Sequence, residues 1–131
     1  MAPGISFVIS TLNSSATLKK CLQHLTKQIY PKKLMEVLIL DGGSTDGTLE
    51  VAKGFCSPLD VKVVKAGFPN NQEARRYFGF KKAKFDLVCV LDSDNYLVDV
   101  NWITKMTRPL KDNPEVVTSF TLHFYYDPRQ N

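Results

Sequence analysis

The chain has 131 residues with 44% hydrophobic and 23% charged side chains, values that fit one globular domain able to bury its own core. No apolar stretch is long enough to span a membrane, and Met1-Ala2-Pro3-Gly4 does not begin a signal peptide, so we expect a cytoplasmic protein. The net charge of +4 is too mild to indicate a nucleic-acid partner, but it suits an anionic ligand or peripheral association with a membrane surface.

The predicted elements alternate between strands and helices along the whole chain. In chain order they are a strand at 5–11, a helix at 16–28, a strand at 37–40, a short helix that Thr45 or Asp46 caps and that ends near Phe55, a strand at 61–64, a helix at 72–84, a strand at 87–91, a helix at 101–111 and a last strand at 116–124. This order predicts an α/β fold, a three-layer sandwich with a mostly parallel sheet and helices on both faces.

The apolar residues of three helices recur at helical spacing and predict which faces turn inward. The predicted inward residues are Leu18, Leu22, Leu25 and Ile29 in the first helix, Ala74, Tyr77, Phe78 and Ala83 in the third, and Trp102, Ile103, Met106 and Leu110 in the fourth. Cys21, Cys56 and Cys89 are widely spaced without a C-x-x-C pair, and Cys89 is expected in the core. His24 and His123 stand apart from other metal-ligating residues, so no zinc site is expected.

Three polar segments follow predicted strands, at 11–13, 41–44 and 92–94. The loops after parallel strands gather at one edge of the sheet, and open α/β sheets bind their ligands there. The segment Asp92-Ser93-Asp94 can be a metal and phosphate site, since Mg²⁺ and Mn²⁺ prefer carboxylate oxygens, or a turn, since Asp and Ser side chains favour turns. The triplet alone leaves both interpretations open, and the convergence of three loops favours the metal site.

Four segments, in the expected order and spacing, resemble those of family 2 glycosyltransferases of the GT-A type. They are the strand and turn 5–13, the Gly-rich acidic loop 37–48, the helix start Glu73-Ala74-Arg75-Arg76-Tyr77-Phe78-Gly79, and the D-x-D motif in Leu91-Asp92-Ser93-Asp94-Asn95. The resemblance implies a GT-A (Rossmann-like) fold and an enzyme that moves a sugar from a nucleotide diphosphate to an acceptor hydroxyl. It implies a UDP-sugar first and a GDP-sugar second, with a saccharide or a lipid-linked molecule as acceptor.

The same resemblance implies the site residues. Those expected to bind the nucleotide-sugar are Ser10, Thr11, Asn13, Asp41, Gly43, Ser44, Arg75, Asp92, Ser93 and Asp94. Asp94 is expected to contact Mn²⁺ or Mg²⁺ directly, while Asp92 contacts the ribose, the sugar or metal-bound water. Asp41 is expected to accept a hydrogen bond from the uracil N–H, and Arg75 to reach the diphosphate.

Several of these residues also have a plain structural interpretation. Gly42 and Gly43 let the backbone approach a ligand, but they equally suit a tight turn. Asp46 is better explained as a helix cap than as a ligand contact. Taken alone, an arginine on the third helix is better explained by a surface salt bridge. The chain also departs from the family pattern, with Gly42 at a commonly acidic position, Leu12 at an aromatic one and Arg76 in place of Asn.

The sequence offers no clear general base for deprotonating an acceptor. Asp127, in Tyr125-Tyr126-Asp127-Pro128, has the context of a turn. We therefore expect residues 1–131 to form a single nucleotide-sugar-binding domain that lacks an acceptor half. The alternatives are a non-catalytic binding or interaction module and a phosphatase of the haloacid dehalogenase class, which also sets D-x-D at a strand end.

Overall fold

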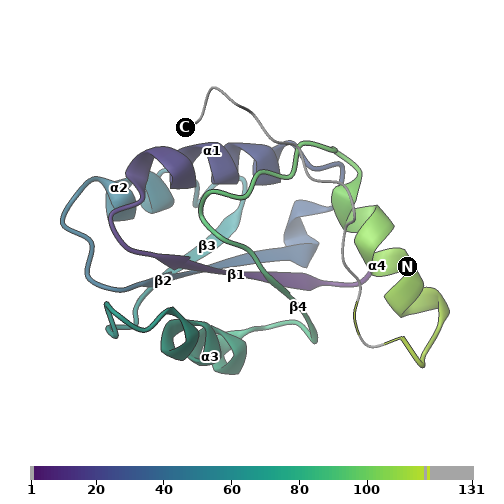
Figure 1. Ribbon diagram of the computed structural model, residues 1–131. Helices are drawn as coiled ribbons and strands as arrows, with labels where there is room; N and C mark the ends of the chain where they lie inside the picture. Colours follow the sequence, from purple (N-terminus) through teal and green to yellow (C-terminus); the bar gives the residue numbers. More distant parts are fainter. Residues whose placement is uncertain (1, 117, 119–131) are drawn as a thin grey trace, which may run out of the picture.

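A computed structural model of the chain describes residues 2–116 and residue 118. Its elements, in chain order, are β1 (Ile5–Thr11), α1 (Ser15–Thr26), the short 3-10 helix η1 (Lys32–Leu34), β2 (Met35–Asp41), α2 (Thr48–Lys53), β3 (Asp60–Lys65), α3 (Gln72–Lys82), β4 (Leu87–Val90) and α4 (Trp102–Asp112). Helices α1 and α2 cover one face of the sheet and α3 covers the other, so the predicted three-layer α/β sandwich is confirmed (Figure 1).

The four strands are all parallel and lie in the order β3-β2-β1-β4. The chain builds the sheet outward from β1 to β3 and then returns to place β4 on the other side of β1. The connection after β1 therefore leads to one side of this strand, and β4 lies on the other side. The loops that follow β1 and β4 lead away from each other between these two strands. Such a topological switch is where open α/β sheets form their ligand crevice.

Both central strands are buried on both faces. Every residue of β1 and β2 is buried, as parallel strands covered by helices require. The larger core lies between the sheet and α1 with α2; its fully buried side chains include Phe7, Ile9, Leu18, Leu22, Leu25 and Ile39. A smaller cluster of Val8, Leu38 and Leu40 lies on the α3 side. Cys89 packs against the larger core, as expected, and burial raises the pKa of its thiol to about 12.

Helix α3 packs on the sheet through a glycine rather than through its aromatic residues. A Cβ added to Gly79 would lie 2.6 Å from a Val8 methyl carbon and 3.0 Å from a Leu40 methyl carbon. Arg75 and Gly79 are the residues that α3 buries, while Tyr77 is 61% exposed. The prediction that Tyr77 and Phe78 face inward is therefore wrong, because the close approach of α3 selects the side that carries Gly79. Ala83, also predicted to face inward, does pack against the smaller cluster.

The ends of two helices also differ from the prediction. Helix α1 stops at Thr26, and Ile29, which was expected to face inward, is 66% exposed. The reason is Gln28, whose buried amide donates to the carbonyls of Leu97 and Asp99 and accepts from the Ile103 amide. Helix α2 ends at Lys53 rather than near Phe55. The predicted strand over 116–124 lies almost wholly outside the described residues.

A buried carboxylate stands at the amino edge of the sheet. Glu36 on β2 accepts hydrogen bonds from the Ser6 hydroxyl at 2.6 Å, the Lys62 ammonium at 2.8 Å and the Lys84 amide at 2.7 Å. Burial alone would raise the pKa of Glu36, but these three donors together hold it below its ordinary value. The ionised form of Glu36 thus ties β1, β3 and the end of α3 to β2.

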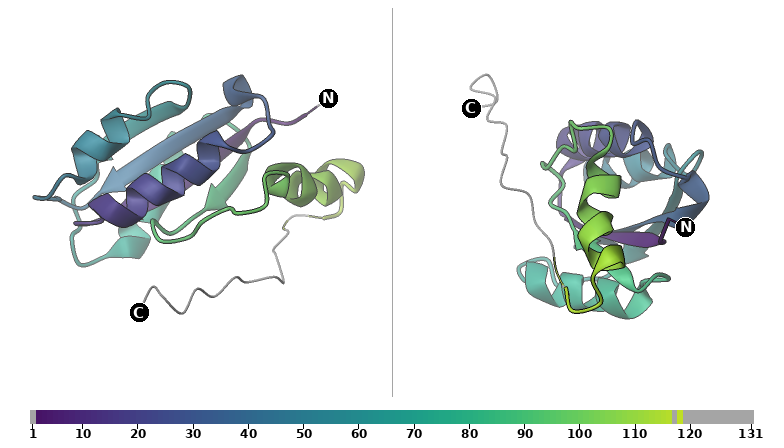
Figure 2. Two further views of the ribbon diagram at one scale, coloured as in Figure 1. Left: turned by 90° about the horizontal axis from the view of Figure 1, so that it is seen from above. Right: turned by 90° about the vertical axis from the view of Figure 1, so that its right-hand side faces the viewer.

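Helix α4 lies apart from the sandwich, at the end of the molecule where the chain begins (Figure 2). Ile103 and Thr107 are its buried residues, so the predicted inward position of Ile103 is confirmed. In the part of the chain that the structure describes, no helix has the length and apolar character needed to cross a bilayer.

Candidate functional site

The carboxyl edge of the sheet brings two of the predicted loops into direct contact. Thr11 pairs with Asp41 at the ends of β1 and β2, and the Gly42 amide donates to the Thr11 carbonyl at 2.9 Å. On the other side of β1, the Leu91 amide donates to the Val8 carbonyl at 3.1 Å, which fixes where the third loop begins. The three loops therefore line one edge, as the strand order predicts.

Asp41 is the centre of the loop after β2. Its Oδ1 accepts from the Thr11 hydroxyl at 2.9 Å and the Ser44 hydroxyl at 2.5 Å, and its Oδ2 accepts from the amides of Gly43 at 3.0 Å and Ser44 at 2.8 Å. Although burial would raise the pKa of Asp41, these hydrogen bonds hold it below its ordinary value. Gly43 has a φ of 110°, a conformation open to glycine, so the turn needs this residue.

Asn13 joins the loop after β1 to the loop after β2. Its amide donates to the Ser44 hydroxyl at 2.9 Å, and its side-chain oxygen accepts from the amides of Thr45 at 2.8 Å and Asp46 at 3.3 Å. Asp46 accepts from the amide of Thr48, the first residue of α2, at 2.9 Å, although the N-cap position itself is Gly47. The two loops thus form one hydrogen-bonded unit.

A hollow of about 350 Å³ opens beside this unit, on the β3 side. Its lining residues are Asp41, Gly43, Ser44, Leu49, Lys65 and Gly67. The volume is at the lower end of the range of small-molecule sites. The wall combines an ionised carboxylate, a hydroxyl, an apolar side chain and a cation, which suits a flat polar group such as a nucleobase.

Arg75 is not among the residues that line the hollow. Its side chain is buried, and its Nη1 donates to the carbonyls of Phe68 at 2.6 Å and Pro69 at 3.2 Å, in the loop that follows β3. Among the described residues, Arg75 forms no ion pair and its Nε has no hydrogen-bond partner. A Cβ at position 42 would lie 2.9 Å from Nη1, so Gly42 leaves the space that the guanidinium occupies.

The segment Asp92-Ser93-Asp94 is both a turn and an acidic site. The Asn95 amide donates to the Asp92 carbonyl at 2.9 Å, and the Asn95 side chain accepts from the Asp92 amide at 3.1 Å. The Asp92 carboxylate is bound by Arg76 Nη2 at 2.6 Å. Asp94 is exposed and has no hydrogen-bond or ion-pair partner within the described part of the chain. The turn interpretation is therefore confirmed, and a metal site at the same segment stays a prediction.

Arg76 and Gln72 belong to this site, and sequence reasoning did not assign either to it. Arg76 also pairs with Glu73 at 2.5 Å, and Gln72 Nε2 lies 3.4 Å from Asp92. The spacing of Glu73 and Arg76 is a local signal for an ion pair, but the link to Asp92 depends on how α3 packs on the sheet. Arg76 supplies the positive charge that two neighbouring carboxylates need.

The expected site residues therefore fall into two groups on either side of β1. Thr11, Asn13, Asp41, Gly43 and Ser44 form the bonded unit beside the hollow, while Asp92, Ser93 and Asp94 lie on the β4 side. Ser10 is buried in β1, and its hydroxyl has no partner among the described residues. An elongated ligand with a base at one end and an anionic, metal-binding group at the other fits this arrangement.

A metal ion held by protein side chains alone does not fit the described residues, because no group of three or more His, Cys, Asp or Glu converges there. Mg²⁺ and Mn²⁺ sites often take only one or two carboxylates and complete their shell with water and ligand phosphates. The Asp94 carboxylate, which has no partner among the described residues, and the Asp92 carboxylate, which Arg76 binds through one oxygen, could supply these one or two protein ligands.

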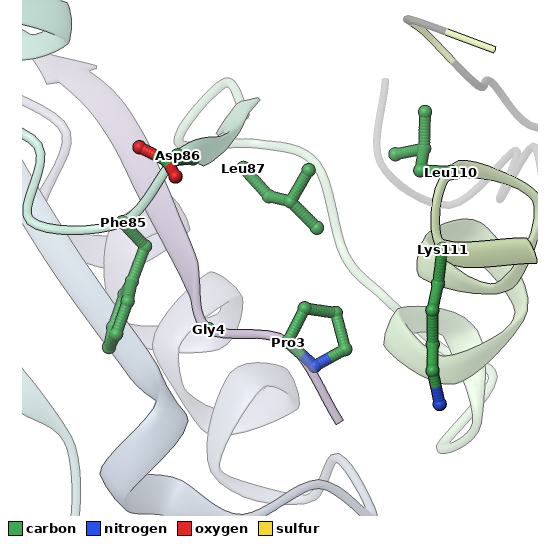
Figure 3. A pocket seen from close by; sticks show the side chains of 7 residues that line it. All are labelled: Pro3, Gly4, Phe85, Asp86, Leu87, Leu110 and Lys111. Carbon is green, nitrogen blue, oxygen red and sulfur yellow. The ribbon is translucent and has the colours of Figure 1, made fainter. Parts of the chain in front are cut away.

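A second hollow, of about 330 Å³, lies at the opposite edge of the sheet. Figure 3 shows its lining, with Pro3, Phe85 and Leu87 from the starts of β1 and β4 on one side and Leu110 with Lys111 from α4 on the other. None of the three polar loops reaches it, so it is separate from the candidate site.

Polar loops that gather at the carboxyl edge of a parallel sheet, around its switch point, are where open α/β domains bind their ligands. Comparison with protein families gives the family: the profile of glycosyl transferase family 2 matches residues 6–131, and the chain belongs to that family. The match is to glycosyltransferases and not to the haloacid dehalogenase class considered from the sequence.

One curated relative is the dolichyl N-acetyl-alpha-D-glucosaminyl phosphate 3-beta-D-2,3-diacetamido-2,3-dideoxy-beta-D-glucuronosyltransferase of Methanococcus voltae. It is 34% identical over 95 residues, which cover 70% of this chain and 29% of the relative. Relatives of this kind are named glycosyltransferases. The chain spans well under half of their length, as it does for the other relatives it matches closely.

Two solved structures show the same fold. TarS of Staphylococcus aureus in complex with UDP superposes with a TM-score of 0.75 at 27% identity, over 83% of this chain and 32% of that chain, and it was also solved with UDP-GlcNAc. The mannosyltransferase PcManGT of Pyrobaculum calidifontis, in complex with GDP-Man and Mn²⁺, has a TM-score of 0.67 at 20% identity, over 76% and 30% of the two chains. The predicted GT-A fold is confirmed.

Proposed function

We propose that this domain binds a nucleotide diphosphate sugar across the carboxyl edge of its sheet, for transfer of the sugar to an acceptor hydroxyl. The observation that carries the proposal is the placement of the Asp41 hollow and the free Asp94 carboxylate on opposite sides of β1. A nucleoside in the hollow puts its diphosphate over the end of β1, within reach of the D-x-D segment. The family supports the same class of ligand.

The base is expected at the hollow beside Asp41. TarS, the relative at 27% identity, holds UDP, which favours a UDP-sugar; a GDP-sugar is the second choice, since a protein of the same fold holds GDP-Man. In the present geometry, both oxygens of Asp41 accept hydrogen bonds from their own loop. A uracil N–H would share this carboxylate or displace the Ser44 hydroxyl.

Asp94, with Asp92, would hold Mn²⁺ or Mg²⁺ together with the diphosphate. When bound, the ion supplies Lewis-acid neutralisation of the diphosphate as a leaving group. Arg76 binds the Asp92 carboxylate at 2.6 Å and so fixes its position at the same edge. Arg75, which was expected to reach the diphosphate, is more usefully assigned to holding the Phe68 and Pro69 carbonyls beside the hollow.

The acceptor is proposed to be a saccharide or a lipid-linked molecule. The Methanococcus voltae relative, by its name, acts on a dolichyl phosphate sugar, which favours a lipid-linked acceptor. No general base is assigned among the described residues, and Asp127 lies outside them. We place the base in polypeptide beyond this domain, because the relatives are much longer. A cytoplasmic location, at the membrane face, is part of the same proposal.

Calorimetric titration tests this function. We expect UDP to bind measurably with Mn²⁺ or Mg²⁺ and much more weakly with a chelator present, because the ion bridges Asp94 and the diphosphate. Asp94→Asn should remove the metal dependence while thermal unfolding is unchanged. Asp112→Asn, which removes an exposed carboxylate at the end of α4, is the matched control and should bind like the wild type.

Equal binding by Asp94→Asn and the wild type, or no binding of UDP or GDP under any metal condition, would contradict the donor-site assignment. A non-catalytic binding module is the second candidate, favoured by the absence of an assigned base among the described residues. A UDP-sugar that binds with the metal and is neither hydrolysed nor transferred would support the module.

A further inference from the structure

The outer face of α3 carries exposed aromatic side chains. Tyr77 is 61% exposed, Phe80 46% and Phe78 36%, and all three lie within four consecutive positions of the helix. Because Gly79 and Arg75 face the sheet, these rings point away from the core or along its flanks. Single exposed apolar residues are ordinary, but three neighbouring aromatic rings on one helix mark an interaction surface.

Lysine side chains lie over these rings. Lys81 Nζ is 4.9 Å from the centre of the Tyr77 ring, and Lys82 Nζ is 5.6 Å from that of Phe78. Lys84 Nζ, just past the helix, is 5.1 Å from the centre of the Phe85 ring. Between residues 72 and 86 the sequence has five basic and two acidic side chains, a net charge of +3, and Glu73 is already paired with Arg76. The surface is therefore both aromatic and cationic.

We propose that this surface, Tyr77, Phe78, Phe80, Lys81, Lys82 and Lys84, docks on a lipid bilayer that contains anionic lipids. Aromatic rings favour the headgroup level of a membrane, and each lysine near an anionic surface adds to the affinity. The lysine stems can lie along the rings while their ammonium groups reach lipid phosphates. A helix with this composition lies in the plane of the interface and does not cross it.

The position of α3 in the fold suits such a contact. Among the described residues, α3 is the helix on its face of the sheet, with α1 and α2 on the opposite face (Figure 1), and its Tyr77 and Phe80 side chains are exposed. The first turn of α3 reaches the D-x-D segment through Gln72 and Arg76, which both contact Asp92. A bilayer under α3 would therefore lie beside the proposed metal site.

Vesicle flotation tests the docking independently of nucleotide binding. We expect the wild-type chain to float with vesicles of equal parts phosphatidylcholine and phosphatidylglycerol, to bind phosphatidylcholine alone much more weakly, and to dissociate as salt is raised. Replacing two lysines (Lys81→Gln with Lys82→Gln) should lower the partition coefficient about thirtyfold. Replacing two rings (Tyr77→Gln with Phe80→Gln) should lower it about tenfold.

The matched control is Lys19→Gln with Lys53→Gln, which removes the same charge from exposed positions on α1 and α2. This control should float nearly like the wild type. Binding of UDP, measured in parallel, should be the same in all of these variants. A failure of vesicle binding is thereby distinguished from a failure of the donor site.

Three results would overturn the proposal. The first is an absence of flotation with anionic vesicles. The second is an equal loss of vesicle binding in the control variant with changes on α1 and α2 and in the variant without the two α3 lysines. That result would show that the binding depends on the net charge of the chain and not on α3. The third is self-association that depends on Tyr77 and Phe80 without flotation, which would make this face an interface between copies of the chain.

Discussion

The carboxylates of Asp41 and Asp94 have opposite environments, and this decides their roles. Asp41 is buried and accepts four hydrogen bonds from its own loop and from Thr11. Asp94 is exposed and is free of hydrogen bonds to the described residues. The first carboxylate is engaged by its own loop, whereas the second has both oxygens unbonded among the described residues, as the proposed metal contact requires. Position after a strand predicted where both carboxylates lie, and the family resemblance predicted their different roles.

Glu36 carries a testable dependence of stability on pH. Its folded pKa, like that of Asp41, lies below the ordinary value, so the native state binds fewer protons than the unfolded state. The stabilisation is complete above the unfolded pKa of about 4 and is lost as the pH falls through the folded pKa.

We expect the free energy of unfolding of the wild type, measured with urea at a series of pH values, to fall steeply below pH about 4. Glu36→Gln should unfold more easily at neutral pH by about 3 kcal/mol, since it leaves the Lys62 and Lys84 donors poorly matched, and should show a shallower acid dependence. Asp60→Asn, next to the same lysine but exposed, is the control. An acid dependence identical in Glu36→Gln and the wild type would show that Glu36 is not the responsible group.

At the scale of elements, the sequence patterns predicted the existence and type of every described α-helix and strand, but not the short 3-10 helix η1 and not every buried face. Short, nearly continuous apolar runs identify β1, β2 and β4, as is typical of strands in parallel sheets that helices cover. The apolar pattern does not predict the buried face of α3, because that face consists of Arg75 and Gly79. Arg75 and Gly79 are selected by close packing and by the Phe68 and Pro69 carbonyls, and neither signal is visible in a hydrophobic pattern.

Gly79→Ala tests how closely α3 approaches the sheet. The new methyl group would meet Val8 at 2.6 Å and Leu40 at 3.0 Å, so α3 must move outward, and we expect a loss of about 1–3 kcal/mol in thermal or urea unfolding despite the better helix propensity of alanine. Gly47→Ala, whose Cβ would have no neighbour nearer than 3.8 Å, should have a small effect. A stabilised Gly79→Ala variant would contradict the packing described for α3.

The outward movement of α3 in Gly79→Ala should also disturb the candidate site, because α3 carries Arg76, which binds Asp92, and Arg75, which binds the loop after β3. The link between Arg76 and Asp92 joins residues far apart in sequence, so no local pattern could have predicted it. The buried position of Arg75 likewise depends on the missing side chain at Gly42. Sequence reasoning thus predicted the loops that meet at the edge, while the contacts between α3 and those loops required the three-dimensional structure.

At the scale of the whole molecule, the strand order β3-β2-β1-β4 is what makes one site from separate segments. The switch at β1 places the hollow at Asp41 on one side and the acidic segment on the other. The family match explains why these segments occur together. The proposed docking of α3 on a bilayer also orients the domain, because it places the acidic segment beside the membrane.

The central claim is that Asp94 and a nucleotide diphosphate hold one metal ion together. Titration of Mn²⁺ followed by electron paramagnetic resonance measures this directly, because the signal of free Mn²⁺ falls as the ion binds. We predict weak Mn²⁺ binding by the protein alone, a marked gain when UDP is added beyond the binding of Mn²⁺ by UDP itself, and loss of that gain in Asp94→Asn. Mn²⁺ binding that does not increase when UDP is added would contradict the account. An increase with UDP that is as large in Asp94→Asn as in the wild type would also contradict it.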